Sequence, residues 1–305
     1  AARHSLRGIC AIVRPMNQSV VNERVESSKA LRTWPAHLSL VFARGGPRTR
    51  LAHSAHEGPL RVQRLFHPDA DGKAHCYLLH PPGGVVLGDE LAIDVTVRSG
   101  AALLTTPSAG RFYTVRAFRE RQEQRVQLRV GAGARLEWLP QESIVFSGAD
   151  ARLSTRIDLA GDARLAYWDV LVLGRPACGD RFDAGRCLQH LDIRRDGRAL
   201  LRETLALEAG DRMSASPLGM GGASTAGLAV LTATLPRDDA EAWLARVNGP
   251  GLAGPFSITQ RGGLLLARYL GEDAQVARAG FSDLWRRVGQ LLDGVEPSEP
   301  RIWHT

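Results

Sequence analysis

The chain has 305 residues, of which 44% are hydrophobic, and it carries a net charge of +7. A chain of this length can bury on the order of three quarters of its unfolded surface, which is enough for one or two domains. Arginine supplies nearly all of the positive charge, and the arginines are spread along a chain with only 6% aromatic residues. Because nucleic-acid binding favours basic residues clustered with exposed aromatics, we expect no nucleic-acid partner.

Targeting and cross-linking signals are missing from the sequence. No apolar run approaches the roughly 20 residues that span a bilayer, and the N-terminus has no apolar signal-peptide core. We therefore expect a cytoplasmic protein with no membrane partner. Cys10, Cys76, Cys178 and Cys187 have no paired short spacing, which argues against a zinc knuckle and against a disulfide framework.

The first 33 residues differ from the rest of the chain because their apolar pattern is weak. We predict that residues 1–33 are a flexible extension. Residues 34–305 are predicted to form a single domain. Its β region covers about residues 38–235, and its helix-containing part covers about residues 236–305.

Several possible metal ligands lie between residues 67 and 80. They are His67, Asp69, Asp71, His75, Cys76 and His80. Imidazole and thiolate groups suit nickel, and carboxylates can add weaker ligands. If residues 75–80 are extended, Cys76 and His80 point to one face and His75 points to the other. We therefore predict transient metal contacts by His75, Cys76 and His80, with exposed histidines that bind no metal as the alternative.

A highly specified loop follows at residues 79–89. It contains Pro81-Pro82-Gly83-Gly84 between His80 and Asp89. Prolines remove backbone donors and glycines permit positive φ, so neither a helix nor a central strand can run through this segment. The loop leads into Leu91, Ile93, Val95 and Val97, whose alternation with small or polar residues predicts a strand.

From Leu38 to about Leu235 the apolar period is two, as expected for strands with one buried face. Three similar turns recur at a spacing of about 30 residues: Gly100-Ala101-Ala102-Leu103, Gly133-Ala134-Arg135-Leu136 and Asp162-Ala163-Arg164-Leu165. A strand repeat of this length predicts a mainly β fold with a stacked-strand or β-helix-like architecture. A β-sandwich is the alternative.

Two helices are predicted near the C-terminus. Asp238 and Glu241 resemble a capping box, and Ala240, Trp243, Leu244 and Val247 follow on one face. A second apolar stripe comprises Phe281, Leu284, Trp285, Val288, Leu291 and Leu292, and Gly294 and Pro297 end that helix. Both stripes indicate ordinary core packing.

Motifs of common enzyme classes are missing as well. The sequence has no GxSxG, HExxH or Walker A segment. Glu137 and Glu142 could serve as paired carboxylates in a β-helical carbohydrate-active enzyme, and we keep that function as an alternative.

Several motifs occur together in one order along the chain. They are Gly58-Pro59-Leu60-Arg61-Val62-Gln63, the loop at 79–89, Leu104-Thr105-Thr106-Pro107-Ser108-Ala109, Leu136-Glu137-Trp138-Leu139-Pro140-Gln141-Glu142, Leu173-Gly174-Arg175-Pro176-Ala177 and Pro300-Arg301-Ile302-Trp303-His304-Thr305. Over about residues 34–305 this set resembles the urease accessory proteins of the UreD (UreH) type. Trp303 could anchor a loop or contact a partner, and the sequence does not decide between these roles.

The resemblance implies a β-helical protein that is not an enzyme. Such a protein docks on urease apoprotein and, together with a UreF-type protein and a UreG-type GTPase, assists nickel insertion into the urease active site. It implies no tightly bound cofactor, only a transient nickel ion. A stand-alone nickel store would instead need tight, stoichiometric binding.

A route for nickel must bind the ion weakly, because each 1.4 kcal/mol of extra affinity slows escape about tenfold. Dispersed carboxylates meet this requirement better than a Cys/His cluster. We predict Asp89, Glu142, Asp169 and Asp180 as nickel-path residues because each lies within or beside a motif of the resemblance. Hydrogen bonding to loop amides is the alternative role for these carboxylates.

Overall fold

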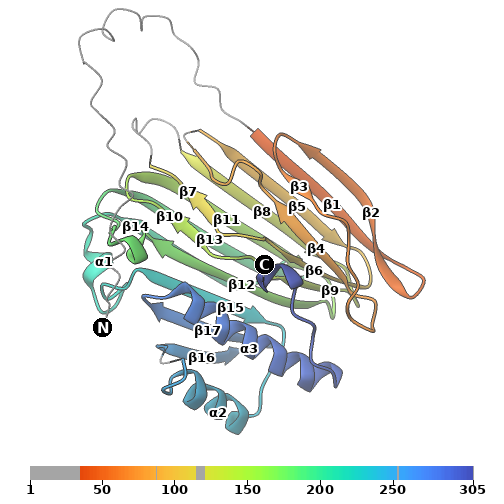
Figure 1. Ribbon diagram of the computed structural model, residues 1–305. Coiled ribbons are helices and arrows are strands. Elements are labelled where there is room, and N and C mark those ends of the chain that lie inside the picture. Colours follow the sequence, from red (N-terminus) through yellow and green to blue (C-terminus); the bar gives the residue numbers. More distant parts are fainter. Residues whose placement is uncertain (1–34, 87, 115–120, 253, 305) are drawn as a thin grey trace, which may run out of the picture. The chain divides into compact units, whose positions relative to one another are not determined.

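Two β-sheets enclose an apolar core in the computed structural model of the chain, which describes residues 35–86, 88–114, 121–252 and 254–304 (Figure 1). The seven-stranded sheet has the order β14 (Arg198–Glu208), β13 (Gly185–Arg195), β11 (Ala149–Leu159), β8 (Gln122–Val130), β5 (Glu90–Val97), β1 (Pro35–Gly45) and β2 (Arg48–Glu57). The prediction for residues 1–33 lies outside the described residues.

The second sheet has ten strands. Eight of them follow the order β16 (Phe256–Arg261), β17 (Leu264–Gly271), β15 (Thr225–Leu231), β12 (Arg164–Leu173), β9 (Arg135–Trp138), β6 (Ala101–Thr105), β4 (Ala74–Leu79) and β3 (Arg61–Val62). The remaining two, β7 (Gly110–Phe112) and β10 (Ser143–Val145), pair with each other, and β10 also pairs with β12.

The central strands stack as a solenoid of about three turns. The chain passes from β5 to β6, from β8 to β9 and from β11 to β12, so each pair places one strand in each sheet. Successive pairs are parallel in both sheets. This arrangement confirms the predicted mainly β, stacked-strand fold and explains the repeat of about 30 residues in the sequence.

The recurring turns connect the two sheets and bond to one another. Gly133 has a φ of +69°, a conformation that glycine adopts without the steric cost of a side chain. Its amide donates to the Asp162 carboxylate of the next turn at 2.6 Å. One solenoid turn thereby satisfies a backbone donor of its neighbour.

The alternation in β5 has the predicted outcome. Leu91, Ile93, Val95 and Val97 are buried, whereas the residues between them are partly exposed. The inward-facing side chains of both sheets form one core, and a second core lies between the ten-stranded sheet and the C-terminal helices.

Three α-helices lie in the described residues: α1 (Arg212–Ala215), α2 (Arg237–Val247) and α3 (Ala274–Asp293). Helix α3 packs on β12 and β15, and α2 packs on β16 (Figure 1). The four-residue α1 and two 3₁₀ segments, at Pro176–Cys178 and Arg301–His304, were not predicted. They are too short to produce a periodic apolar pattern.

The predicted capping box of α2 is wrong. The N-cap residue is Pro236, which makes no side-chain cap, and Asp238 already lies inside the helix. The Glu241 carboxylate instead accepts a hydrogen bond from the Arg237 guanidinium at 2.7 Å. The Glu241 carboxylate is therefore engaged in an i,i+4 ion pair and does not cap the start of the helix.

The predicted stripe of α3 is correct except in its last turn. Phe281, Leu284, Trp285 and Val288 are buried, and the helix ends at Gly294 in the left-handed conformation. Leu291 and Leu292, however, are 50% and 44% exposed. In that turn Asp293 faces the sheet, where it pairs with arginines at the starts of β9 and β12.

Candidate functional site

Strand β4 carries two of the three predicted nickel contacts and buries both. The His75 Nε2 atom lies 2.8 Å from an Asp69 carboxylate oxygen, whereas its Nδ1 atom has no hydrogen-bond partner among the described residues. Cys76 packs in the core between the sheets, where burial raises the pKa of its thiol to about 12. A thiol that remains protonated near neutral pH is a poor metal ligand.

His80 follows β4 and lines a cavity of about 270 Å³. Burial lowers the pKa of His80, while the charge of Asp89 acts in the opposite direction. The neutral imidazole that binds metals is therefore favoured. The cavity is walled on one side by residues 106–111 and on another by Leu91 and Ile93 of β5.

The structure does not bring His75, Cys76 and His80 together at one point. His75 bonds to Asp69, Cys76 packs in the core, and His80 lines the cavity. Within residues 35–86, 88–114, 121–252 and 254–304, no three His, Cys, Asp or Glu side chains form a group that could hold a metal ion. The predicted contacts of these three residues with nickel stay a prediction.

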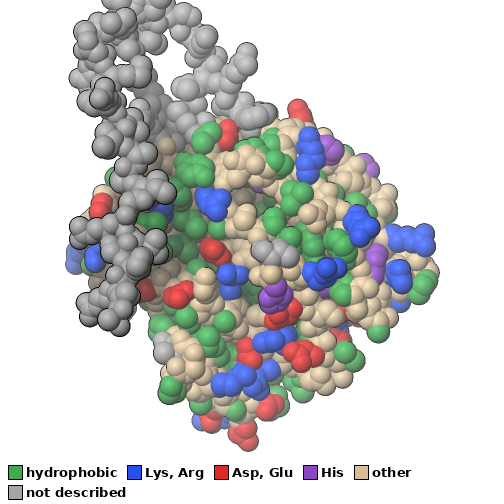
Figure 2. Space-filling view, in the orientation of Figure 1, with side chains coloured by type: hydrophobic (Ala, Val, Ile, Leu, Met, Phe, Trp, Pro, Cys, Tyr) green, Lys and Arg blue, Asp and Glu red, His purple; other side chains and the backbone are tan. Residues whose placement is uncertain are grey.

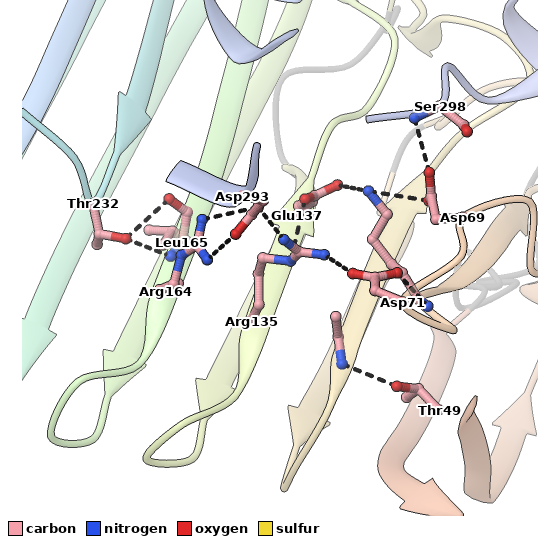
Figure 3. A network of polar contacts seen from close by, with 12 residues as sticks. Thr49, Asp69, Asp71, Arg135, Glu137, Arg164, Leu165, Thr232, Asp293 and Ser298 are labelled. Atoms are coloured by element: carbon pink, nitrogen blue, oxygen red, sulfur yellow. Dashed lines mark hydrogen bonds and ion pairs between the residues drawn. The ribbon is translucent and has the colours of Figure 1, made fainter. Parts of the chain in front are cut away.

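A buried lysine lies at the centre of a polar network beside β4, and its two carboxylate partners, Asp69 and Glu137, are labelled in Figure 3. The Lys73 side chain is 1% exposed, and its Nζ atom lies 2.9 Å from Glu137 and 3.3 Å from Asp69. It also lies 5.5 Å from the centre of the Trp285 ring. Burying an ammonium group costs several kcal/mol unless opposite charges compensate, and here two carboxylates do so.

Asp69 connects this lysine to the end of the chain. Burial would raise the pKa of Asp69, but the hydrogen bond to His75, the charge of Lys73 and the amide of Ser298 together hold that pKa well below its usual range. The Ser298 amide donates to the carboxylate at 2.9 Å. The ionised carboxylate thus joins two nearby residues, Lys73 and His75, to Ser298, which lies 229 residues later in the sequence.

The network continues through two arginines to α3 (Figure 3). The Arg135 guanidinium pairs with Asp71, and it lies 2.6 Å from Asp293 and 3.5 Å from Glu137. Burial would lower the pKa of Arg135, but these carboxylates raise it above its ordinary value. Arg164 holds the same Asp293 at 2.6 Å. These contacts attach the last residue of α3 to the starts of β9 and β12.

A cleft of about 410 Å³ opens between the sheets at the other end of the solenoid, and Asp169 of β12 lines it together with Glu203 of β14. The Tyr167 hydroxyl donates to the Asp169 carboxylate at 2.5 Å. Burial raises the pKa of Asp169 to about 6, against the opposing hydrogen bonds from Tyr167 and Gln189. The neighbouring charge of Glu203 raises it further.

Asp89 and Asp180 hold loops in place. The Asp89 carboxylate accepts a hydrogen bond from the Val86 amide at 2.9 Å, which closes the loop before β5. The Asp180 carboxylate bonds to the Arg175 guanidinium at 2.8 Å, and the backbones of these two residues also bond to each other. The Asp89 carboxylate therefore makes the loop-amide contact that we considered as the alternative to a nickel path, whereas the Asp180 carboxylate pairs with an arginine side chain.

Glu142 and Glu137 are held by different cations. Glu142 pairs with Arg278 of α3 at 3.0 Å, whereas Glu137 is buried against Lys73 and Arg135. A glycosidase needs two carboxyl groups that face the same scissile bond. The contacts of Glu137 and Glu142 give no support to that alternative.

Lys73 and Glu203 are the residues that sequence reasoning missed. A signal existed for Lys73, since it is the only lysine in residues 34–305 and lies inside the stretch 67–80. Glu203 lies outside every motif and reaches the cleft only because β14 pairs with β13 at the edge of the sheet.

Charges of both signs are mixed on the surface. On the face shown in Figure 2, Lys and Arg side chains alternate with Asp and Glu side chains over the region of α2 and α3. Ion pairs such as Arg246 with Asp283 and Arg286 with Glu299 belong to this region.

In the described part of the chain, no helix has both the length and the apolar character needed to cross a membrane.

Comparison with known proteins gives one consistent result. The family model described as UreD urease accessory protein matches residues 35–304. The chain is 42% identical over 277 residues to a urease accessory protein UreD of Saccharophagus degradans, covering 90% of this chain and 94% of that protein. It is 45% identical over 274 residues to the protein of the same name from Pseudomonas aeruginosa strain UCBPP-PA14, covering 89% and 95% of the two chains. The corresponding protein of Dechloromonas aromatica is 42% identical over 276 residues, covering 90% and 95%.

Proposed function

The chain belongs to the UreD family of urease accessory proteins, and from this premise we propose that it docks on apo-urease and assists the insertion of nickel into the urease active site. The family gives the chain a role in urease maturation as a helper rather than as the catalyst. The match over residues 35–304 is the observation that carries the proposal.

The proposed partners follow from the same premise. The family implies interaction with urease and with other accessory proteins. We propose that these are the urease apoprotein, a UreF-type protein that contacts this chain, and a UreG-type GTPase that joins through the complex. Urea hydrolysis and GTP hydrolysis then belong to the partners, and the complex acts in the cytoplasm.

Nickel is the cargo in this scheme, and two places between the sheets suit its passage. The cleft offers the Asp169 carboxylate beside Glu203, which is paired with Arg268 of the same cleft. The cavity lined by His80 offers an imidazole near Asp89. In the seven-stranded sheet, β11 lies between β13, which lines the cleft, and β8, which lines the cavity. Because each place has few ligands, each would bind nickel weakly and release it.

The four carboxylates predicted for the path do not have equal support. Asp169 lines one of the two places, where its carboxylate also accepts a hydrogen bond from Tyr167. Asp89, Asp180 and Glu142 already make specific loop or helix contacts. We propose Asp169 as the first path residue to test, with His80 and Asp89 next, while His75 and Cys76 come last because both are buried.

The primary experiment measures urease purified from cells that contain the other accessory proteins, with and without this chain. Nickel content and urea hydrolysis should both be lost without the chain and restored by it. Full nickel loading in its absence would refute the proposal. Tight stoichiometric nickel binding by the purified chain, together with unimpaired urease loading without it, would favour a nickel store instead.

Asparagine variants then test the path. Asp169→Asn should lower the nickel content of urease while the variant stays folded and remains in the accessory complex. Asp239→Asn is a matched control, because Asp239 is exposed in the first turn of α2 and makes no ion pair in the described structure. Equal nickel loading by the two variants would remove Asp169 from the path.

A further inference from the structure

The segment after α3 returns across the ten-stranded sheet and ends beside strands that lie much earlier in the sequence (Figure 1). The Ser298 amide bonds to Asp69, and the Tyr77 hydroxyl faces the backbone amides of Arg301 and Ile302. The segment carries Trp303, which packs against the core beneath α3. Its contacts show what this tryptophan holds in place.

The indole of Trp303 begins a directed chain of hydrogen bonds. Its Nε1 atom donates to the Thr105 hydroxyl oxygen at 2.9 Å, and Thr105 is 1% exposed. An indole N–H can only donate, so the threonine hydroxyl is free to donate onward. It does so to the Leu139 carbonyl at 2.5 Å. Trp303 therefore orients a buried hydroxyl that holds the carbonyl of residue 139.

The ring of Trp303 supports the next carbonyl through a second tryptophan. The rings of Trp303 and Trp168 have centres 5.6 Å apart. The Trp168 indole donates to the Pro140 carbonyl at 2.8 Å. Two consecutive carbonyls, of Leu139 and Pro140, are thus held by groups that Trp303 contacts directly.

The segment at residues 139–142 in turn holds the wall of the His80 cavity. The Gln141 amide donates to the Thr106 hydroxyl oxygen at 3.0 Å, and the Gly110 amide donates to the Glu142 carbonyl at 2.9 Å. Residues 106–111 form one wall of that cavity. A continuous set of contacts thereby leads from Trp303 to the cavity wall.

We propose that Trp303 is a positioning residue that fixes the loop at residues 106–111 and thereby the shape of the His80 cavity. The positioning rests on geometry alone, and its link to cargo passage rests on the proposed function. This role explains why three of the motifs, at 104–109, 136–142 and 300–305, occur together: they meet at one set of hydrogen bonds.

Hydrogen exchange of the full chain tests the positioning. Trp303→Phe keeps the ring contact and removes the N–H donor, so the amides of Gly110 and Gln141 should exchange roughly two- to tenfold faster. Thr105→Val removes the hydroxyl and should give at least the same increase, whereas Thr105→Ser should retain most of the protection. In the double variant Trp303→Phe with Thr105→Val, the same two amides should exchange at the rate seen in Thr105→Val alone. Both changes break the same chain of hydrogen bonds, from Trp303 through Thr105 to Leu139.

A matched control separates this role from a general loss of packing. The Trp243 Nε1 atom is buried and has no hydrogen-bond partner among the described residues. Trp243→Phe deletes the same atoms in the same core and should leave exchange at residues 105–111 and 139–142 unchanged. Unchanged exchange in Trp303→Phe, or an equal increase in Trp243→Phe, would overturn the proposal.

Urease loading then tests the link to cargo passage. Trp303→Phe should lower the nickel content of urease relative to Trp243→Phe, with both variants present in the accessory complex. Faster exchange with full nickel loading would overturn the link to cargo. If the wild-type chain itself fails to support nickel loading, the proposed function fails, and the exchange experiment still decides whether Trp303 positions the loop.

Discussion

Replacing Lys73 by methionine tests whether the buried network holds the C-terminal part of the chain to the solenoid. Methionine has a similar length and no charge, so Lys73→Met leaves Glu137 and Asp69 without their shared cation. Removing one partner of a buried ion pair costs about 3–5 kcal/mol. Glu137 retains Arg135, and Asp69 retains His75 and the Ser298 amide. We therefore expect the lower end of that range, about 3 kcal/mol.

Urea unfolding followed by tryptophan fluorescence measures this loss, because Trp285 lies against the lysine. With a slope of about 3 kcal/mol per molar urea, the midpoint should fall by about 1 M. Adding Glu137→Gln removes one of the two buried carboxylate charges that lost the lysine, so the double variant should be more stable than Lys73→Met alone. A loss below about 1 kcal/mol in Lys73→Met, or a double variant less stable than the single one, would refute the reasoning.

Three further predictions follow from the environments of single residues. The pKa of Asp69 is lowered, so its contribution to the free energy of unfolding is complete above the ordinary aspartate pKa near 3.9 and is lost as the pH falls. Asp69→Asn should therefore have a lower unfolding free energy than wild type at pH 7, and this difference should shrink below about pH 4. Asp169 has the opposite sign, because its pKa is raised to about 6. Wild type should lose stability as the pH rises from about 4 through 6, whereas Asp169→Asn should not. Unfolding of both chains across this pH range measures the difference. Parallel curves of unfolding free energy against pH would contradict the raised pKa. Gly185→Ala should destabilise the chain more than Gly133→Ala, because the added Cβ would lie 2.3 Å from the Ala149 carbonyl oxygen in the first case and meets nothing within 4 Å in the second. Thermal unfolding compares the two, and equal melting temperatures would contradict the steric argument.

The repeated architecture could be predicted from the sequence because it has a local cause. Period-two alternation and a turn that recurs at about 30 residues are both properties of short segments, and the observed parallel stacking follows from them. The helix stripes were predicted for the same reason. The predicted capping box failed because the helix begins at Arg237, so that Asp238 lies inside it, and the two leucines in the last turn of α3 are exposed because Asp293 faces the sheet.

The candidate site was harder to predict because its contacts join distant parts of the sequence. Whether His75 is buried and bonded to Asp69 or exposed as a ligand depends on how the loop at residues 67–73 packs on β4, and no local pattern records this. Lys73 shows the same limit, since its partner Glu137 lies in a different solenoid turn. Asp169 could be selected as a carboxylate beside a motif, but its cleft with Glu203 exists only once β14 and β15 are in place.

The order of synthesis gives the closing contacts a particular timing. Each solenoid turn pairs with the turn made just before it, so the central strands can assemble while the chain is still growing. The bond from Ser298 to Asp69 spans 229 residues, and the bond from Trp303 to Thr105 spans 198. These contacts of high contact order can form only after α3 has been made. In a growing chain the central strands are therefore made before Trp303 can hold residues 139–142, so the segment that secures the wall is made after the strands that it secures.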